Sequence, residues 1–206
     1  MNLGWIPSMG MYLMGIFIIA CTFKQVLRKT APSTKANLET LLEAEHEAQY
    51  TRSKSLPSEL LLHVDFEKYP SVQQMDCQKK YQQLMRYAHL SMINLQGKTN
   101  LELKQTYGPQ TLELIGQYEK NYFGFMDISI QYGKILYENG YLLEARQTLE
   151  QCLLYQCDVS KCYILLIEIY KALNDEQALN ELEIIIQREM SQSPFLHKVL
   201  AILKTK

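Results

Sequence analysis

Residues 128–182 decide the fold of this chain, and they read ISIQYGKILYENGYLLEARQTLEQCLLYQCDVSKCYILLIEIYKALNDEQALNEL. Two rows of residues within this stretch follow one pattern. The first row is Ser129, Tyr132, Leu136, Ala145 and Leu149, and the second is Tyr163, Leu166, Tyr170, Ala178 and Leu182. Ala145 and Ala178 lie roughly 33 residues apart, and a fixed period of this size indicates stacked copies of one small unit.

Each copy has the pattern of two amphipathic helices joined by a short break. Apolar residues recur at i, i+3 and i+4 in both halves, which predicts one buried stripe per helix. The breaks fall at 139–140 and 174–175. Gly140 tolerates the left-handed backbone that often ends a helix. The small residues Gly133 and Ala145 fit a close crossing of two helices. We therefore expect two helical hairpins.

The spacing Ser129-x2-Tyr132-Gly133-x2-Leu136, followed by Ala145-x3-Leu149, resembles the tetratricopeptide repeat (TPR) family, whose period is ~34 residues. The second copy departs from the family pattern because its turn is one residue shorter. Ser129 stands where the family usually has a large aromatic residue, Ile167 where it has glycine, and Cys157 where it often has proline. The alternative interpretation is an unrelated pair of helical hairpins.

The whole chain is predicted to be all-α, a short TPR-like solenoid of helical hairpins preceded by one transmembrane helix. Sparse glycine and proline agree with this class. We expect an α-helical domain over 71–206, with repeat-like units over 126–159 and 160–193 and a capping helix over 194–205. Within it we expect helices over 71–96, from 109 to about 119, and over 122–139, 142–156, 160–173, 175–190 and 195–204.

Residues 24–70 are predicted to hold a basic flank, a juxtamembrane helix over 38–50 and an irregular linker. Leu60, Leu62, Val64 and Phe66 alternate with less apolar residues, which is close to a period of two. A lone strand has no partner in a helical protein. We therefore expect a short helix near 57–62 and then an extended segment packed on the solenoid, with the sharper hypothesis that it occupies the binding groove.

The N-terminal residues 1–23 contain no charged side chain. Residues 3–23 are long enough to cross a bilayer as a helix, which takes ~20 residues. Lys24, Arg28 and Lys29 follow this run, and the positive-inside rule then places the N-terminus outside and the domain in the cytoplasm. The alternative is a cleaved export signal. Ile18-Ile19-Ala20-Cys21 resembles a bacterial lipobox, which would make the chain an exported lipoprotein or envelope-complex subunit lipidated at Cys21.

No residue set with recognisable chemistry stands out. Five cysteines form no disulfide framework, so reduced thiols are expected. Cys152, Cys157 and Cys162 lack the spacing and partners of a zinc site. Phosphate-binding loops and hydrolase motifs are absent from the sequence. A net charge of −1 gives no basic field for nucleic acid. We expect no enzyme activity, no cofactor, no metal, no nucleic acid and no small-molecule substrate.

The TPR resemblance implies a protein-binding groove formed by the first helix of each hairpin. Helical repeats commonly hold an extended or helical peptide in such a groove. We therefore predict a membrane-anchored scaffold that recruits a protein or peptide partner at the cytoplasmic face. By position, the groove residues would be Asp127, Ile130, Lys134, Tyr137 and Glu138 in the first unit, and Lys161, Ile164, Glu168 and Lys171 in the second.

Overall fold

A computed structural model of the chain describes residues 36–205. These residues are all-helical and contain no strand, which confirms the predicted fold class for this part of the chain. The predicted anchor over 3–23 and Cys21 lie outside the described residues. Over 36–205, no helix is both long enough and apolar enough to cross a membrane. The described chain forms two compact units, one of residues 36–54 and 99–110, the other of residues 55–98 and 111–205.

The first unit contains a helix over 36–49 and α3 (Asn100–Tyr107). Lys104 Nζ lies 2.6 Å from a carboxylate oxygen of Glu45, and the amide of Lys54 donates to the carbonyl of Tyr107. Thr99 and Glu102 form a reciprocal capping box at the start of α3. The helix over 36–49 agrees with the helix predicted over 38–50, although the apolar residues of its predicted stripe are mostly exposed. Its juxtamembrane position stays a prediction.

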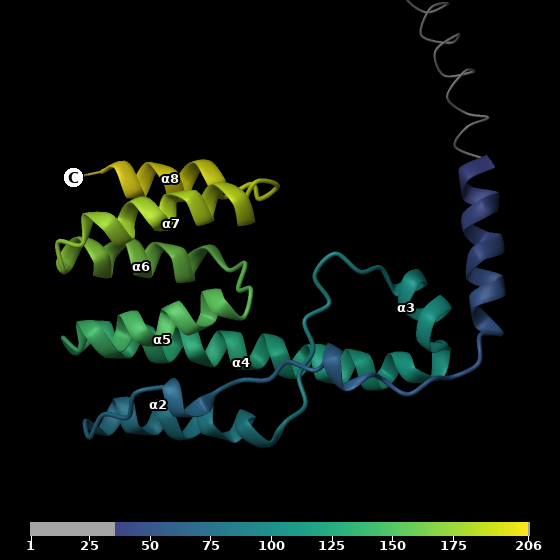
Figure 1. The fold of residues 1–206 in the computed structure, drawn as a ribbon, viewed down its shortest axis with the longest axis horizontal. Helices are drawn as coiled ribbons and strands as arrows, with labels where there is room; N and C mark the ends of the chain where they lie inside the picture. The colour runs from purple at the N-terminus through teal and green to yellow at the C-terminus, as the bar shows by residue number, and fades with distance from the viewer. Residues whose placement is uncertain (1–35, 206) are drawn as a thin grey trace, which may run out of the picture. The chain divides into compact units, whose positions relative to one another are not determined.

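The second unit is a stack of helices (Figure 1). Helix α4 packs against α2 on one side and α5 on another, and α6, α7 and α8 follow in turn. Short 3-10 turns η1 (Ser58–Leu60), η2 (Phe66–Lys68), η3 (Arg86–His89) and η4 (Pro109–Thr111) lie between longer elements. The helices are α2 (Met75–Met85), α4 (Leu112–Glu138), α5 (Leu142–Leu154), α6 (Ser160–Ala172), α7 (Glu176–Glu189) and α8 (Leu196–Lys204).

The two predicted hairpins are present as α4/α5 and α6/α7. Gly133 lies against Leu149, so that a Cβ added at Gly133 would stand 2.7 Å from Leu149 Cγ. Gly140 has a φ of 82°, as expected for the residue that ends α4. The second turn uses Asn174 with a φ of 54°, and Asp175 then caps α7 by accepting from the amide of Ala178 at 2.9 Å.

Two regions differ most from the predicted helices. The helix predicted over 71–96 begins as α2 only at Met75, where the Gln74 side chain caps it, and ends at Met85 with one further 3-10 turn. Beyond it the backbone is extended at Leu90, and tertiary hydrogen bonds hold the next residues: Leu62 N–H donates to the Met92 carbonyl and Ile93 N–H to the Tyr118 carbonyl. These contacts and the burial of Met92 and Ile93 outweigh local helix propensity.

The second difference is in α4. The prediction divides this region into helices over 109–119 and 122–139, whereas α4 runs without a break from Leu112 to Glu138. Pro109 lies in η4, before α4 begins. Residues 119–122 contain neither proline nor glycine, so nothing in the local sequence interrupts the helix.

The segment over 57–70 confirms the predicted extended packing. Leu62, Val64 and Phe66 pack on the core, while the residues between them are exposed. Its polar contacts go to α4 and α5: Tyr132 Oη donates to the Pro70 carbonyl, and the Asp65 amide donates to Tyr155 Oη at 3.0 Å. None of these hydrogen-bond partners is among the nine predicted groove residues, and the hypothesis that this segment occupies the binding groove stays a prediction.

Helix α8 covers the last hairpin, packing on both α6 and α7. Val199 is fully buried, and Ile202 and Leu203 pack against the core. Phe195, which we expected to share this role, is 54% exposed. Phe195 immediately precedes α8, where its backbone rather than its ring is held: its amide donates to Ser193 Oγ at 3.3 Å, and its carbonyl accepts from the Val199 amide at 3.1 Å. The predicted capping helix is therefore present, without Phe195 in its buried face.

Candidate functional site

The nine predicted groove residues do not form one open surface. Asp127, Lys134, Glu138, Lys161 and Glu168 are exposed, on α4 and α6. Ile130, by contrast, is only 3% exposed, and Tyr137 and Ile164 are half-buried against the core. We call the nine positions together the α4/α6 face.

Some polar residues of the α4/α6 face already have partners within the chain. Lys171 Nζ donates to the carbonyls of Ile202 and Thr205, so it binds the C-terminal end of α8. Lys134 and Glu138 form an i,i+4 ion pair at 3.1 Å. The predicted role of this face in partner binding stays a prediction, with Lys171 reassigned to holding α8.

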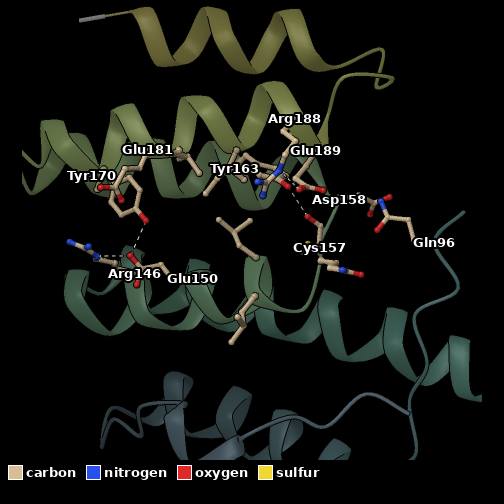
Figure 2. A pocket seen from close by; sticks show the side chains of 16 residues that line it. Gln96, Arg146, Glu150, Cys157, Asp158, Tyr163, Tyr170, Glu181, Arg188 and Glu189 are labelled. Atoms are coloured by element: carbon tan, nitrogen blue, oxygen red, sulfur yellow. Dashed lines mark hydrogen bonds and ion pairs between the residues drawn. The ribbon is translucent and has the colours of Figure 1, made fainter. Parts of the chain in front are cut away.

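A cleft of about 510 Å³ lies elsewhere in the stack, between α5 and α7 (Figure 2). We call it the α5/α7 cleft. The intervening helix α6 contributes Tyr163 and Tyr170, both buried. None of the nine residues of the α4/α6 face lines it. Its lining consists of Gln96, Arg146, Glu150, Leu153, Leu154, Gln156, Cys157, Asp158, Tyr163, Tyr170, Ala178, Glu181, Leu182, Ile185, Arg188 and Glu189.

One end of the α5/α7 cleft is organised by Arg146 of α5. Its guanidinium donates to Glu150 at 2.7 Å and to Asp175 at 2.8 Å, and its Cζ lies 5.1 Å from the centre of the Tyr170 ring. Tyr170 Oη donates to the same Glu150 oxygen at 2.9 Å. Arg146 thus connects α5 with the N-terminal cap of α7 and holds this end of the cleft in one arrangement.

The contacts around Arg146 shift the pKa values of Asp175, Arg146 and Tyr170. The Ala178 amide, and after it the guanidinium of Arg146, hold the pKa of the Asp175 carboxyl below its usual value. Hydrogen bonding to Glu150 raises the pKa of Arg146. Burial, and then the neighbouring Glu150, raise the pKa of Tyr170. At neutral pH the cluster therefore contains an ionised carboxylate at Asp175, a guanidinium and a protonated phenol.

The middle of the cleft is apolar. Leu153 and Leu154 come from α5, and Ala178, Leu182 and Ile185 from α7. Leu154 is 63% exposed, which is a large fraction for an apolar side chain at the edge of a cavity. Tyr163 Oη donates to the Cys157 carbonyl at 2.9 Å and fixes the loop that follows α5.

The other end is polar, and it is formed by the loop after α5 and the C-terminal turn of α7. Asp158, Arg188, Glu189 and Gln96 lie here (Figure 2). Arg188 pairs with Glu189 at 2.7 Å. Over its whole length the cleft is lined by four carboxylates and two guanidinium groups, a formal excess of two negative charges.

Three cysteines lie in or beside the loop that connects α5 to α6. Cys152, Cys157 and Cys162 are buried and reduced. Hydrogen bonding to the sulfurs of Cys152 and Cys157, and then burial, raise the pKa of the Cys162 thiol. The same contact with Cys162 lowers the pKa of Cys157. Within residues 36–205, no group of three or more His, Cys, Asp or Glu side chains is placed to hold a metal ion.

The polar groups of the cleft lining are largely engaged within the chain. Its tyrosine hydroxyls already donate hydrogen bonds, to the Cys157 carbonyl and to Glu150. No histidine lines the cleft, and its one thiol, Cys157, is 3% exposed. What the lining offers to a ligand is an apolar strip between groups of carboxylates.

Sequence reasoning missed this cleft, although two signals pointed to parts of it. Arg146 and Glu150 stand at i,i+4 on a predicted helix, a spacing typical of an ion pair. Leu153 and Leu154 are adjacent apolar residues near the end of a predicted helix, so they lie about 100° apart around its axis and widen its apolar stripe. The cleft itself depends on the separation between α5 and α7, which no local pattern encodes. Comparison of the chain with protein-family models, curated proteins and solved structures finds no match.

Proposed function

We propose that this chain is a non-catalytic scaffold that holds a protein partner at a membrane, through a surface on its stack of helical hairpins. The observation that carries the proposal is the α5/α7 cleft, which combines an apolar strip, the exposed Leu154 and charged groups at both ends. Stacked helical hairpins of TPR-like architecture commonly bind peptides along such surfaces.

In this proposal, residues 3–23 attach the chain to the membrane as a transmembrane helix. Lys24, Arg28 and Lys29 after the apolar run favour a cytoplasmic domain. In the alternative sequence interpretation, lipidation at Cys21 would place the same domain outside the cytoplasm. Either arrangement leaves the binding surface on the same helices, so partner binding and topology are separate measurements.

Partner recovery from membranes tests the proposal. The full-length chain with a C-terminal tag would be purified in mild detergent, and co-purifying proteins would be quantified by mass spectrometry. Leu154→Asp places a charge on the apolar strip of the cleft, and we expect it to lower recovery of the partner at least tenfold, since hot-spot truncations cost about 2 kcal/mol or more. Leu143→Asp is the matched control, because Leu143 lies on the same helix and is 65% exposed but does not line the cleft.

A second variant addresses the α4/α6 face. Replacing Lys134 and Tyr137 together by alanine alters the face that the sequence predicts to be the groove. Loss of the partner with this variant and not with Leu154→Asp would keep the scaffold function and move its site to α4 and α6. If neither variant lowers recovery of any stoichiometric partner while helicity is intact, the scaffold proposal is wrong.

A further inference from the structure

The α5/α7 cleft has a charge pattern that specifies what it can bind. We infer that its occupant is a basic amphipathic segment of a partner protein, in which two Lys or Arg residues flank a short apolar stretch. This inference rests on the proposed scaffold function and adds the chemistry of the partner.

The excess of carboxylates is local to the cleft. The chain as a whole is nearly balanced, with 21 Lys and Arg against 22 Asp and Glu. In the cleft, Arg146 is engaged by Glu150 and Asp175, and Arg188 is paired with Glu189. Glu181 accepts only from the neutral amide of Gln177, and Asp158 has no ion-pair partner among the described residues. Both are exposed, so they remain available to cationic groups of a ligand.

The positions of the carboxylates set a spacing. Glu181 lies toward the Tyr170 end of the cleft, and Glu189 and Asp158 lie at the opposite end (Figure 2). Glu189, which lies at the Asp158 end, is eight residues from Glu181 on α7, so Glu181 and the end where Asp158 is available are separated by about 12 Å along a helix. Two basic side chains of a bound helix seven residues apart are separated by about 10 Å, and in an extended chain three to four residues cover this distance.

The apolar strip between the two ends takes the uncharged part of the ligand. The strip is lined by Leu153, Leu154, Leu182 and Ile185. A leucine-sized side chain of the ligand inserted there would be buried from water, and it would also bury the exposed Leu154. Apolar burial supplies affinity at about 25 cal/mol per Å², while the flanking charges select the orientation and exclude acidic segments.

The open form of the cleft favours a polypeptide over a small molecule. Sites for small molecules bury about 70–90% of their ligand and are largely enclosed. Here Leu154 is 63% exposed, and the side chain of Arg188 is 72% exposed. An open cleft of this kind can bind a polypeptide that continues beyond both of its ends, such as a few turns of an amphipathic helix.

Binding of defined peptides to the full-length chain in detergent tests the inference. The probe is a fluorescein-labelled, alanine-rich helical peptide with two arginines seven residues apart and leucines at the third and fourth positions after the first arginine, so that all four lie on one face. A second peptide has glutamates in place of the arginines, and a third has serines in place of the leucines. Fluorescence anisotropy at low salt gives the dissociation constants.

We expect the arginine peptide to bind at least tenfold more tightly than the glutamate peptide, since the arginines form two attractive charge pairs where the glutamates face like charges. Replacing Asp158 and Glu181 together by lysine should reverse this preference, so that the glutamate peptide binds more tightly. The serine peptide should bind at least tenfold more weakly to the unmodified chain. The matched control is the double replacement of Asp127 and Glu168 by lysine on the α4/α6 face, which should leave the preference unchanged.

Three outcomes would overturn the inference: equal binding of the arginine and glutamate peptides, no reversal by the Asp158 and Glu181 replacements, or reversal by the control variant instead. These results are distinguishable from failure of the scaffold function. If Leu154→Asp still releases a natural partner but the charge replacements have no effect on peptide binding, the scaffold function holds and the basic character of the partner is wrong.

Discussion

Gly133 shows at the scale of one residue how closely the helices of the first hairpin approach. A Cβ built on Gly133 would stand 2.7 Å from both Cγ and Cδ2 of Leu149, well inside normal van der Waals contact. Leu149 is fully buried and therefore has little room to move away. The small residue at this position is required by the crossing of α4 and α5.

Gly133→Ala should lower the free energy of unfolding by about 1–3 kcal/mol, because overpacking in a closed core costs more than the gain in helix propensity returns. The measurement is urea unfolding of the full-length chain in detergent, followed by circular dichroism. Gly116→Ala is the matched control, since Gly116 lies in the same helix with no atom within 4 Å of its added Cβ. The control should be more stable than the unmodified chain by roughly 0.5–1 kcal/mol. Equal stability of the two variants would contradict the packing described for α4 and α5.

Lys171 is a second residue whose role follows from its contacts. The sequence places it on the predicted groove, whereas its ammonium group binds two carbonyls at the end of α8. A cation at the C-terminal end of a helix is favoured by the helix dipole and by the unsatisfied carbonyls there. The periodic pattern places Lys171 on the first helix of the second hairpin, and it cannot show that α8 ends beside this residue.

At the scale of elements, the short helix α8 depends on a few contacts. It is nine residues long, has one fully buried side chain, Val199, and is held at its end by Lys171. An isolated helix of this length is not stable in water, so its structure depends on packing.

Lys171→Met should increase the hydrogen exchange rate of the backbone amides of α8 by roughly tenfold, because it removes charge-assisted hydrogen bonds that hold the end of the helix. Exchange would be followed by mass spectrometry on peptides covering 196–204. Lys161→Met is the control, since Lys161 lies exposed on the same helix α6. Unchanged exchange in α8 for Lys171→Met, or an equal increase for both variants, would show that Lys171 does not secure α8.

The sequence predicts the elements of the two hairpins well because their signals are local. Apolar periodicity, Gly140 and the Asn174-Asp175 turn act within a few residues of each helix end. The sequence does not predict where α2 ends, because the extended backbone after Leu90 depends on hydrogen bonds to Leu62 and Tyr118, which are distant in the chain. The α5/α7 cleft is missed for the same reason, since it depends on the distance between two helices that are not adjacent in sequence.

At the scale of the whole molecule, the α4/α6 face and the α5/α7 cleft are the two candidate surfaces for binding a partner. The α4/α6 face has partly exposed charges, but Ile130 is buried and Lys171 is engaged. The α5/α7 cleft has an apolar strip with an exposed leucine and an excess of carboxylates. Because exposed apolar surface next to charged groups is typical of interaction sites, we place the partner in the cleft.

The most direct test of this placement is photo-crosslinking from the cleft in intact cells. A photoreactive benzophenone amino acid would replace Leu154 in the full-length chain, and in a second chain it would replace Leu143, which is equally exposed on the same helix but lies outside the cleft. We predict that irradiation yields one discrete protein adduct from position 154 and none from position 143, with the crosslinked residue in a basic amphipathic segment of the partner. Adducts of equal yield from both positions, or an adduct from neither, would contradict the account.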